Sequence, residues 1–146
     1  MPVNRTLVVV TLLAACSGGP GPLSDAEIAV VMKCVDRLTP SSAEYANLLR
    51  VYGETSPRLA LDQIEPTIAA CDDAHDLLVK GDGRAKGLAR AEESLSGALL
   101  LARLDFESSG LRGEPVGADT LDEVQRRVDQ FINECRLAGL SVDEVQ

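Results

Sequence analysis

Apolar side chains recur in steps of three and four residues along most of this chain, and this spacing constrains the fold more than any other feature. One such series runs through Leu61, Ile64, Ile68, Cys71, His75 and Leu78. Steps of three and four place side chains on one face of an α-helix. No segment shows the alternation with period two that a half-buried strand requires. We therefore predict an all-α domain over residues 24–146, a small bundle of four long helices plus one short helix.

Short polar motifs predict where the helices begin. In a capping box, a hydroxyl and a carboxylate three residues apart bond the free N–H groups of the first turn. Three pairs have this spacing: Ser24 with Glu27, Ser41 with Glu44, and Thr120 with Glu123. Ser56 followed by Pro57 is typical of a fourth start. Pro66 lies inside the helix that follows, and we expect it to kink or break that helix because its ring clashes with the preceding turn.

The longest helix is expected from Arg84 to about Ser108, a segment rich in Ala, Leu, Glu and Arg. One side of it is lined by Leu88, Leu95, Leu99, Ala102 and Phe106, and Leu100, Leu101 and Leu104 widen the apolar surface. A helix this apolar is expected in the middle of the bundle. Residues 110–117, which contain Pro115, are expected to form a loop.

The N-terminal residues have the composition of an export signal. Arg5 gives the start a positive charge, residues 6–15 are uncharged, and small residues precede Cys16. An uncharged run of about ten residues is shorter than the roughly 20 residues that a membrane-spanning helix needs. The sequence therefore predicts a signal peptide over residues 1–15.

Leu13, Ala14, Ala15 and Cys16 match the lipobox at all four positions, so this segment resembles the signal peptides of bacterial lipoproteins. The resemblance implies cleavage between Ala15 and Cys16, a diacylglyceryl thioether on Cys16 and often a further acyl group on the new α-amine. Several acyl chains together hold a protein on a bilayer. Ser17 after the cysteine implies the outer membrane if the host is diderm. The alternative is an uncleaved buried strand followed by an unrelated cysteine.

The remainder divides into a tether and one domain. Residues 16–23 are rich in Gly and Pro and are expected to form a flexible linker. Residues 24–146 are long enough for a single core. No cofactor is expected apart from the covalent lipid on Cys16.

Composition excludes several classes of partner. The formal net charge is −9 and becomes −10 after cleavage, because Arg5 is the only charged side chain removed. A surface this acidic argues against nucleic acid and against a polybasic contact with anionic lipid. The chain has no Trp and only two Tyr and two Phe, so platforms for stacking bases or sugars are nearly excluded.

Three cysteines remain once Cys16 is assigned to lipid, namely Cys34, Cys71 and Cys135. Export permits disulfides, so we expect either one bridge and one buried thiol or three buried thiols. Cys34 with Cys71 closes the shorter loop and is slightly favoured, with a chain-entropy contribution of about 4 kcal/mol. Pairing of Cys135 with either of the other two stays open.

Two segments could carry chemistry. Cys71 and His75 are four residues apart, on one helical face, and could bind a metal or form a thiolate–imidazolium pair. No matching pair of His or Cys is evident elsewhere, and both residues are expected to point into the core. Residues 81–87 place glycines and cations at a helix start, where an anion could bind, but a plain turn explains them better. We predict no catalytic and no metal-binding residue.

Together these features favour a lipid-anchored, non-catalytic accessory that binds or assembles another envelope protein. Pilotins, the small helical outer-membrane lipoproteins that chaperone secretion channels, are similar in size, anchoring and helix content, an analogy of architecture alone. One alternative is a metal-binding or enzymatic lipoprotein that uses Cys71 and His75. Another is a structural surface lipoprotein. An exposed apolar stripe would favour the binding protein over the structural one.

Overall fold

The computed structural model describes residues 23–40, 44–80, 85–140 and 142, and within these ranges it contains five α-helices and no strand. The helices are α2 (Asp25–Leu38), α3 (Tyr45–Thr55), α4 (Pro57–Lys80), α5 (Lys86–Arg112) and α6 (Ala118–Leu137). The predicted all-α class is confirmed. The predicted residues 13–17, which carry the lipobox and the cleavage site, lie outside the described ranges.

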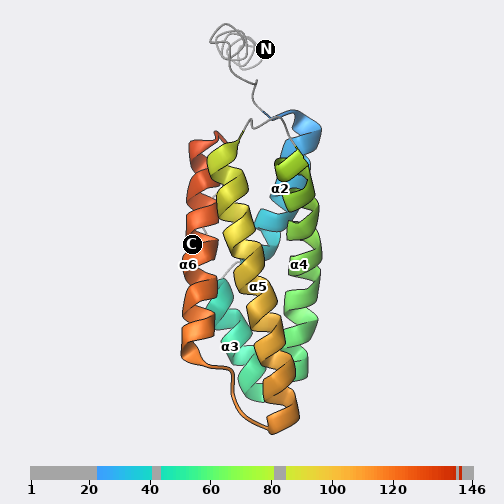
Figure 1. Cartoon of the computed structure of the whole chain (residues 1–146), viewed down its shortest axis with the longest axis vertical. Helices are drawn as coiled ribbons and strands as arrows, with labels where there is room; N and C mark the ends of the chain where they lie inside the picture. The colour runs from blue at the N-terminus through green and yellow to red at the C-terminus, as the bar shows by residue number, and fades with distance from the viewer. Residues whose placement is uncertain (1–22, 41–43, 81–84, 141, 143–146) are drawn as a thin grey trace, which may run out of the picture.

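The helices form an antiparallel bundle with four positions. Helices α4, α5 and α6 run side by side along the long axis, and α2 and α3 follow one another in the fourth position (Figure 1). Helix α4 contacts α2, α3 and α5, while α6 contacts α3 and α5. The chain therefore runs down through α2 and α3, up α4, down α5 and up α6, the up-down-up-down order of a four-helix bundle. Pro40 separates the two halves of the first leg because a helix rarely continues into the residue before a proline.

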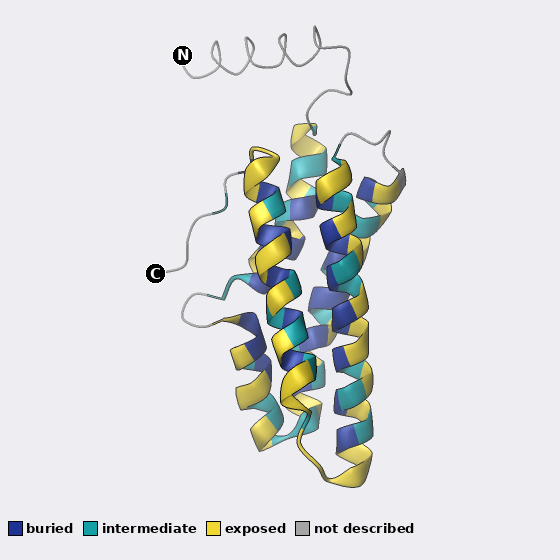
Figure 2. Cartoon of the chain, turned by 60° about the vertical axis from the view of Figure 1, so that its left-hand side comes forward, coloured by how far each residue is buried: buried dark blue, intermediate teal, exposed yellow. Residues whose placement is uncertain are grey.

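The core is aliphatic and continuous from one end of the bundle to the other. Its largest fully buried side chains include Leu38, Leu49, Ile64, Leu95, Leu99, Phe106 and Phe131. Buried positions face the bundle interior on each helix (Figure 2). Burial of about 25 cal/mol per Å² of apolar surface is the main term that stabilises such a bundle.

The first capping box is present, but the third was predicted wrongly. Ser24 Oγ accepts from Glu27 N at 3.2 Å, and Glu27 Oε1 accepts from Ser24 N at 2.9 Å. Helix α6 instead begins at Ala118 with Gly117 as its N-cap, so Thr120 lies in the first turn. The Thr120 hydroxyl donates to the carboxylate of Asp105 on α5. A charged acceptor on the neighbouring helix outcompetes the local cap.

The second capping box also differs from the prediction. Helix α3 begins at Tyr45 after Glu44, and no side chain of its own first turn caps it. Ser41 lies outside the described residues. The cap comes from α6, where Gln125 Oε1 accepts from Ala46 N at 3.1 Å.

Pro66 does not break α4, which is continuous from Pro57 to Lys80. The predicted break is therefore wrong, and the kink stays a prediction. A proline in a helix interior costs roughly 3 kcal/mol, and Ile64 and Ile68 on either side are both buried in the core. Packing of both flanks against the same core offsets the missing hydrogen bond.

Helix α5 extends to Arg112, past the predicted end near Ser108. The first residues of the expected loop are therefore helical. Gly110 packs over Pro57 of α4, since a Cβ on Gly110 would lie 3.5 Å from Pro57 Cβ. The helix ends at Gly113, whose φ of 68° is the left-handed conformation typical of a terminating glycine.

Candidate functional site

Four leucines on the outward side of α5 are exposed to solvent. Their side chains are exposed by 39 % at Leu100, 60 % at Leu101, 52 % at Leu104 and 90 % at Leu111. The sequence predicts that Leu100, Leu101 and Leu104 widen the apolar surface of a helix in the middle of the bundle. Helix α5 does pack between α4 and α6, but the opposite side of the helix buries Leu95, Leu99 and Phe106. The four exposed residues are called the leucine stripe.

The leucine stripe leaves a large part of its apolar surface in solvent, about half at Leu101 and Leu104 and nearly all at Leu111. Leu100, Leu104 and Leu111 follow one another in steps of four and seven, so they lie along one face of the helix. The other large exposed apolar side chains are dispersed over three helices: Val51, Leu59, Val79 and Leu137. Single exposed apolar residues are normal on protein surfaces, whereas contiguous ones mark interaction sites.

Three carboxylates follow the edge of α4 that borders α5. Glu65, Asp72 and Asp76 are exposed and spaced by seven and four residues. Asp72 is near enough to α5 to help raise the pKa of Glu92 on that helix. Within the described residues, no ion pair neutralises any of the three. We call them the acidic row.

The opposite border of α5 is formed by α6, where the carboxylate of Glu123 is ion-paired. Glu123 Oε2 lies 2.7 Å from Arg126 Nη1, and Glu123 Oε1 lies 2.7 Å from Arg127 Nε. The two borders of the leucine stripe therefore differ in ion pairing, because the acidic row on the α4 side has none among the described residues.

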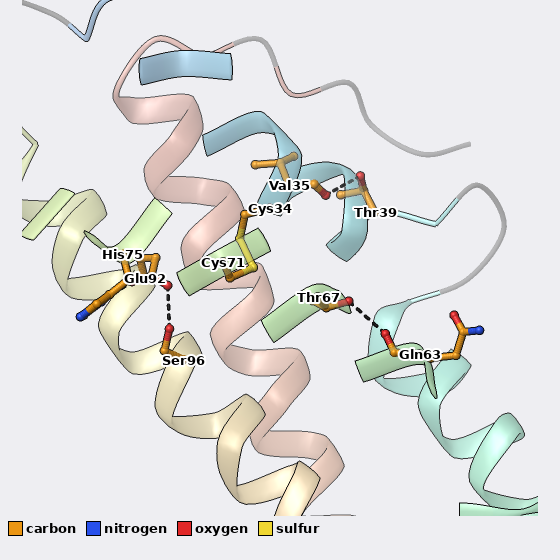
Figure 3. Close-up of a disulfide and its surroundings, with 9 residues drawn as sticks. All are labelled: Cys34, Val35, Thr39, Gln63, Thr67, Cys71, His75, Glu92 and Ser96. Atoms are coloured by element: carbon orange, nitrogen blue, oxygen red, sulfur yellow. Dashed lines mark hydrogen bonds and ion pairs between the residues drawn. A yellow bond between two sulfur atoms is a disulfide. The ribbon is translucent and has the colours of Figure 1, made fainter. Parts of the chain in front are cut away.

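His75 on α4 and Glu92 on α5 join the two longest helices (Figure 3). His75 Nδ1 lies 2.6 Å from Glu92 Oε2, and Ser96 Oγ donates to Glu92 Oε1 at 2.6 Å. The Glu92 side chain is fully buried, and burial raises its pKa above the ordinary value, while the hydrogen bonds from Ser96 and His75 oppose that rise. His75 is 32 % exposed at the edge of the interface rather than deep in the core.

This cluster has the residue types of a hydrolase triad but not its connectivity. A nucleophilic serine must hydrogen-bond to the histidine that takes its proton. Here Ser96 bonds to the carboxylate, which stands between the hydroxyl and the imidazole. The arrangement gives Ser96 no base and links α4 to α5. The sequence patterns do not single out Glu92 or Ser96. The available signal was the position of Glu92 three residues before Leu95, on the same face of the helix as that apolar residue.

Cys34 and Cys71 form a disulfide that ties α2 to α4 (Figure 3). Both residues are fully buried. This is the pair that the sequence slightly favoured, and the alternatives with Cys135 do not form. Cys135 is a buried free thiol whose pKa is raised to about 12 by burial and by Glu134.

The disulfide removes Cys71 from the pair that the alternative metal-binding hypothesis would use. A sulfur in a disulfide cannot ligate as a thiolate, and His75 Nδ1 is engaged with Glu92. Among the residues that the structure describes, no group of three or more His, Cys, Asp or Glu side chains could hold a metal ion.

The start of α5 does not favour an anion. Residues 81–84 lie outside the described ranges, and the helix begins at Lys86 after Ala85 without a side-chain cap. A Cβ on Gly87 would lie 2.6 Å from Glu134 Oε2 of α6. A carboxylate therefore already occupies the positive end of the helix dipole and would repel an incoming anion.

Two open grooves lie between other helices, and both are lined largely by charged or polar residues. One, of about 420 Å³, separates α3 from α6 and is bordered by Asn47, Arg50, Gln125, Arg126 and Asp129. The other, of about 490 Å³, separates α2 from α4 and is bordered by Lys33, Asp36, Arg37, Pro66 and Ala70. Neither brings a reactive group together with a deep apolar pocket, in contrast to usual ligand sites.

Over the described ranges, none of the helices combines the length and the apolar character needed to cross a membrane. Comparison with known proteins yields no matching family model, no matching curated sequence and no matching solved structure.

Proposed function

We propose that this protein is a lipid-anchored accessory of a bacterial cell envelope that binds another protein through the leucine stripe and has no catalytic role of its own. The observation that carries the proposal is the exposure of Leu101, Leu104 and Leu111 on one face of a helix whose opposite face is already buried. Covering these side chains would release about 25 cal/mol per Å² of apolar surface, a gain that folding of the isolated chain does not make.

The competing functions explain the stripe less well. A metal-binding or enzymatic lipoprotein would draw on Cys71 and His75, but Cys71 is held in a disulfide and His75 binds a buried carboxylate. A purely structural surface protein has no need of exposed leucines, which promote aggregation. A binding protein does need them.

The position of the stripe fits an anchor at Cys16. Helix α2 and helix α5 begin at the same end of the bundle (Figure 1), and Cys16 precedes α2 in the sequence. At 1.5 Å per residue, Leu100 and Leu111 lie roughly 20 and 40 Å along α5 from its start at Lys86. Lipid on Cys16 would hold the end of the bundle where α2 and α5 begin near the bilayer. The stripe lies farther along α5 and would face a partner at a greater distance from the membrane.

Pilotins offer an analogy of architecture. The analogy concerns a small helical domain on a lipid anchor, and no residue motif extends it to a particular secretion channel. The proposal is therefore limited to partner binding at the envelope.

The anchor is tested by fractionating cells that express the native chain or Cys16→Ala. We expect the native protein in the membrane fraction, labelled by a radioactive fatty acid, and the variant unlabelled and released. A Cys16→Ala protein that stays membrane-bound would refute the lipid anchor.

The binding role is tested by cross-linking in the intact envelope and purification in detergent. A stoichiometric partner should be captured by the native protein, lost with Leu101→Ser combined with Leu104→Ser, and retained with Val51→Ser, an exposed apolar residue on α3. Equal capture by all three proteins, or capture by none, would refute partner binding through the stripe.

A further inference from the structure

We infer that the leucine stripe and the acidic row together form a docking surface for a basic amphipathic helix of the partner. This inference rests on the proposed function and adds the chemistry of the partner segment. It combines an apolar surface on α5 with the acidic row on its α4 border, whose three carboxylates form no ion pair among the residues that the structure describes.

The apolar part of the surface has the length of a short helix. From Leu100 to Leu111 the stripe spans about 16 Å along the axis, or three turns. An amphipathic helix that presents apolar residues in steps of three and four covers such a stripe by ridge-and-groove packing. An extended strand would gain less, since α5 offers no free backbone groups to pair with.

Two contacts determine where the acidic row lies relative to the stripe. His75 pairs with Glu92, and Pro57 lies under Gly110. Both pairs have the same sum of residue numbers, as an antiparallel alignment of α4 and α5 requires. On this register, Glu65 is level with Ala102, beside the stripe.

The same register places Asp72 and Asp76 level with Leu95 and Ala91, beyond the Leu100 end of the stripe. The negative charge is therefore concentrated at that end. Helix α5 adds Glu93, Arg90 and Lys86 on its exposed side toward that end. Among the described side chains, three negative charges therefore face two positive ones, and the balance stays negative. A partner helix that covers the leucines would place one of its ends over these carboxylates, and Lys or Arg at that end would find opposite charges.

Charge also decides among the possible occupants. A second copy would bring the same formal charge of −9, and two such chains repel one another. An anionic lipid surface is repelled for the same reason. A basic protein segment is attracted by the acidic row and gains the apolar contact as well.

The test uses the predicted mature protein, residues 16–146, with Cys16→Ser. This variant carries no lipid and therefore needs no detergent. The probe is a fluorescein-labelled model peptide of about four helical turns, with leucines along one face and lysines beside them at one end. A matched peptide carries glutamates in place of the lysines. Binding is measured by fluorescence anisotropy at low and high salt.

We expect the Leu/Lys peptide to bind at least tenfold more tightly than the Leu/Glu peptide, and more weakly as salt rises. Leu104→Ser should weaken binding of the Leu/Lys peptide by about tenfold, and Val51→Ser should leave this binding unchanged. Asp72→Asn combined with Asp76→Asn should weaken it by about threefold, whereas Asp36→Asn on α2 should not. All these positions are exposed, and far-UV circular dichroism confirms that each variant is folded.

Four results would overturn the inference. Equal binding of the two peptides, or equal weakening by Asp36→Asn and by the Asp72/Asp76 variant, would remove the role of the acidic row. A dimer in sedimentation equilibrium that Leu104→Ser abolishes would assign the stripe to a second copy. Stripe-dependent binding to phosphatidylcholine vesicles would assign it to lipid.

The two proposals fail separately. If the cross-linked partner still depends on Leu101 and Leu104 while the peptides fail to discriminate, the binding function stands and only the basic amphipathic helix is wrong. If no stripe-dependent partner is captured, the proposed function fails whatever the peptides do.

Discussion

Gln125 of α6 caps the amino terminus of α3, because its side-chain oxygen accepts a hydrogen bond from Ala46 N at 3.1 Å across 79 positions of sequence. The first N–H groups of a helix have no partner within the helix. Here the missing partner comes from another helix, so the fold of one element depends on the docking of the other.

Replacing this cap should destabilise the whole bundle. Gln125→Ala leaves Ala46 N, which is partly buried, without an acceptor and should lower the free energy of unfolding by about 1 kcal/mol. Gln125→Glu keeps the oxygen acceptor but loses the amide donor that bonds Asp129 Oδ1 at 2.9 Å and places two carboxylates four residues apart, so it should recover only part of the stability. Urea denaturation followed by circular dichroism gives the values. As a control, Gln130→Ala on the exposed side of α6 should change stability by less than about 0.5 kcal/mol, and a Gln125→Ala variant as stable as that control would contradict the capping role.

The buried carboxylate of Glu92 should make stability depend on pH. Its pKa is raised in the folded state, chiefly by burial, so the folded chain holds this proton more tightly than the unfolded chain. The contribution is fully present below the ordinary pKa of 4.5 and is lost as pH rises through the higher folded-state value.

Glu92→Gln cannot ionise and should escape this loss. Its stability relative to the native chain should rise as pH increases above 4.5, by about 1.4 kcal/mol for each unit by which the folded-state pKa is raised. Urea midpoints measured from pH 4 to pH 8 test this difference. A difference that stays flat, or that falls with pH, would mean that the contact with His75 outweighs burial.

The disulfide between Cys34 and Cys71 should carry much of the stability of α2, whose main contacts are with α4. Cys34→Ala combined with Cys71→Ala should lower the free energy of unfolding by roughly 3–5 kcal/mol. Native protein that is reduced while unfolded and then refolded with reductant should lose a similar amount. Cys135→Ala, a buried free thiol, serves as the control, since its stability should respond to reductant as the native protein does. Denaturation midpoints that are the same with and without reductant would refute a stabilising bridge.

The leucine stripe should be dispensable for folding. Leu104→Ser alters a side chain that is 52 % exposed, and it should change the free energy of unfolding by less than about 0.5 kcal/mol while reducing aggregation. Leu99→Ser, on the buried side of the same helix, should cost at least 3 kcal/mol. Thermal denaturation of the two variants makes the comparison. Similar losses in both would place Leu104 in the core and remove the basis of the binding proposal.

The sequence by itself determined the features that depend on neighbours within one or two helical turns. The helical class, the cap formed by Ser24 and Glu27, and the start of α4 at Ser56 and Pro57 all follow from local backbone chemistry. The predicted lipid attachment at Cys16 belongs to the same category, since a signal peptide is recognised by its linear pattern, and it remains a prediction.

Only the tertiary structure decided which partners meet across helices. Thr120 caps nothing in α6 because Asp105 of α5 offers a charged acceptor, and α4 continues through Pro66 because the core holds both of its flanks. A helical period shows which residues share a face, but it cannot show how much of that face a neighbour covers. The exposure of Leu101 and Leu104 and the burial of Glu92 therefore emerge from the packing of α4, α5 and α6, where steric coverage and not spacing determines which side chains reach solvent.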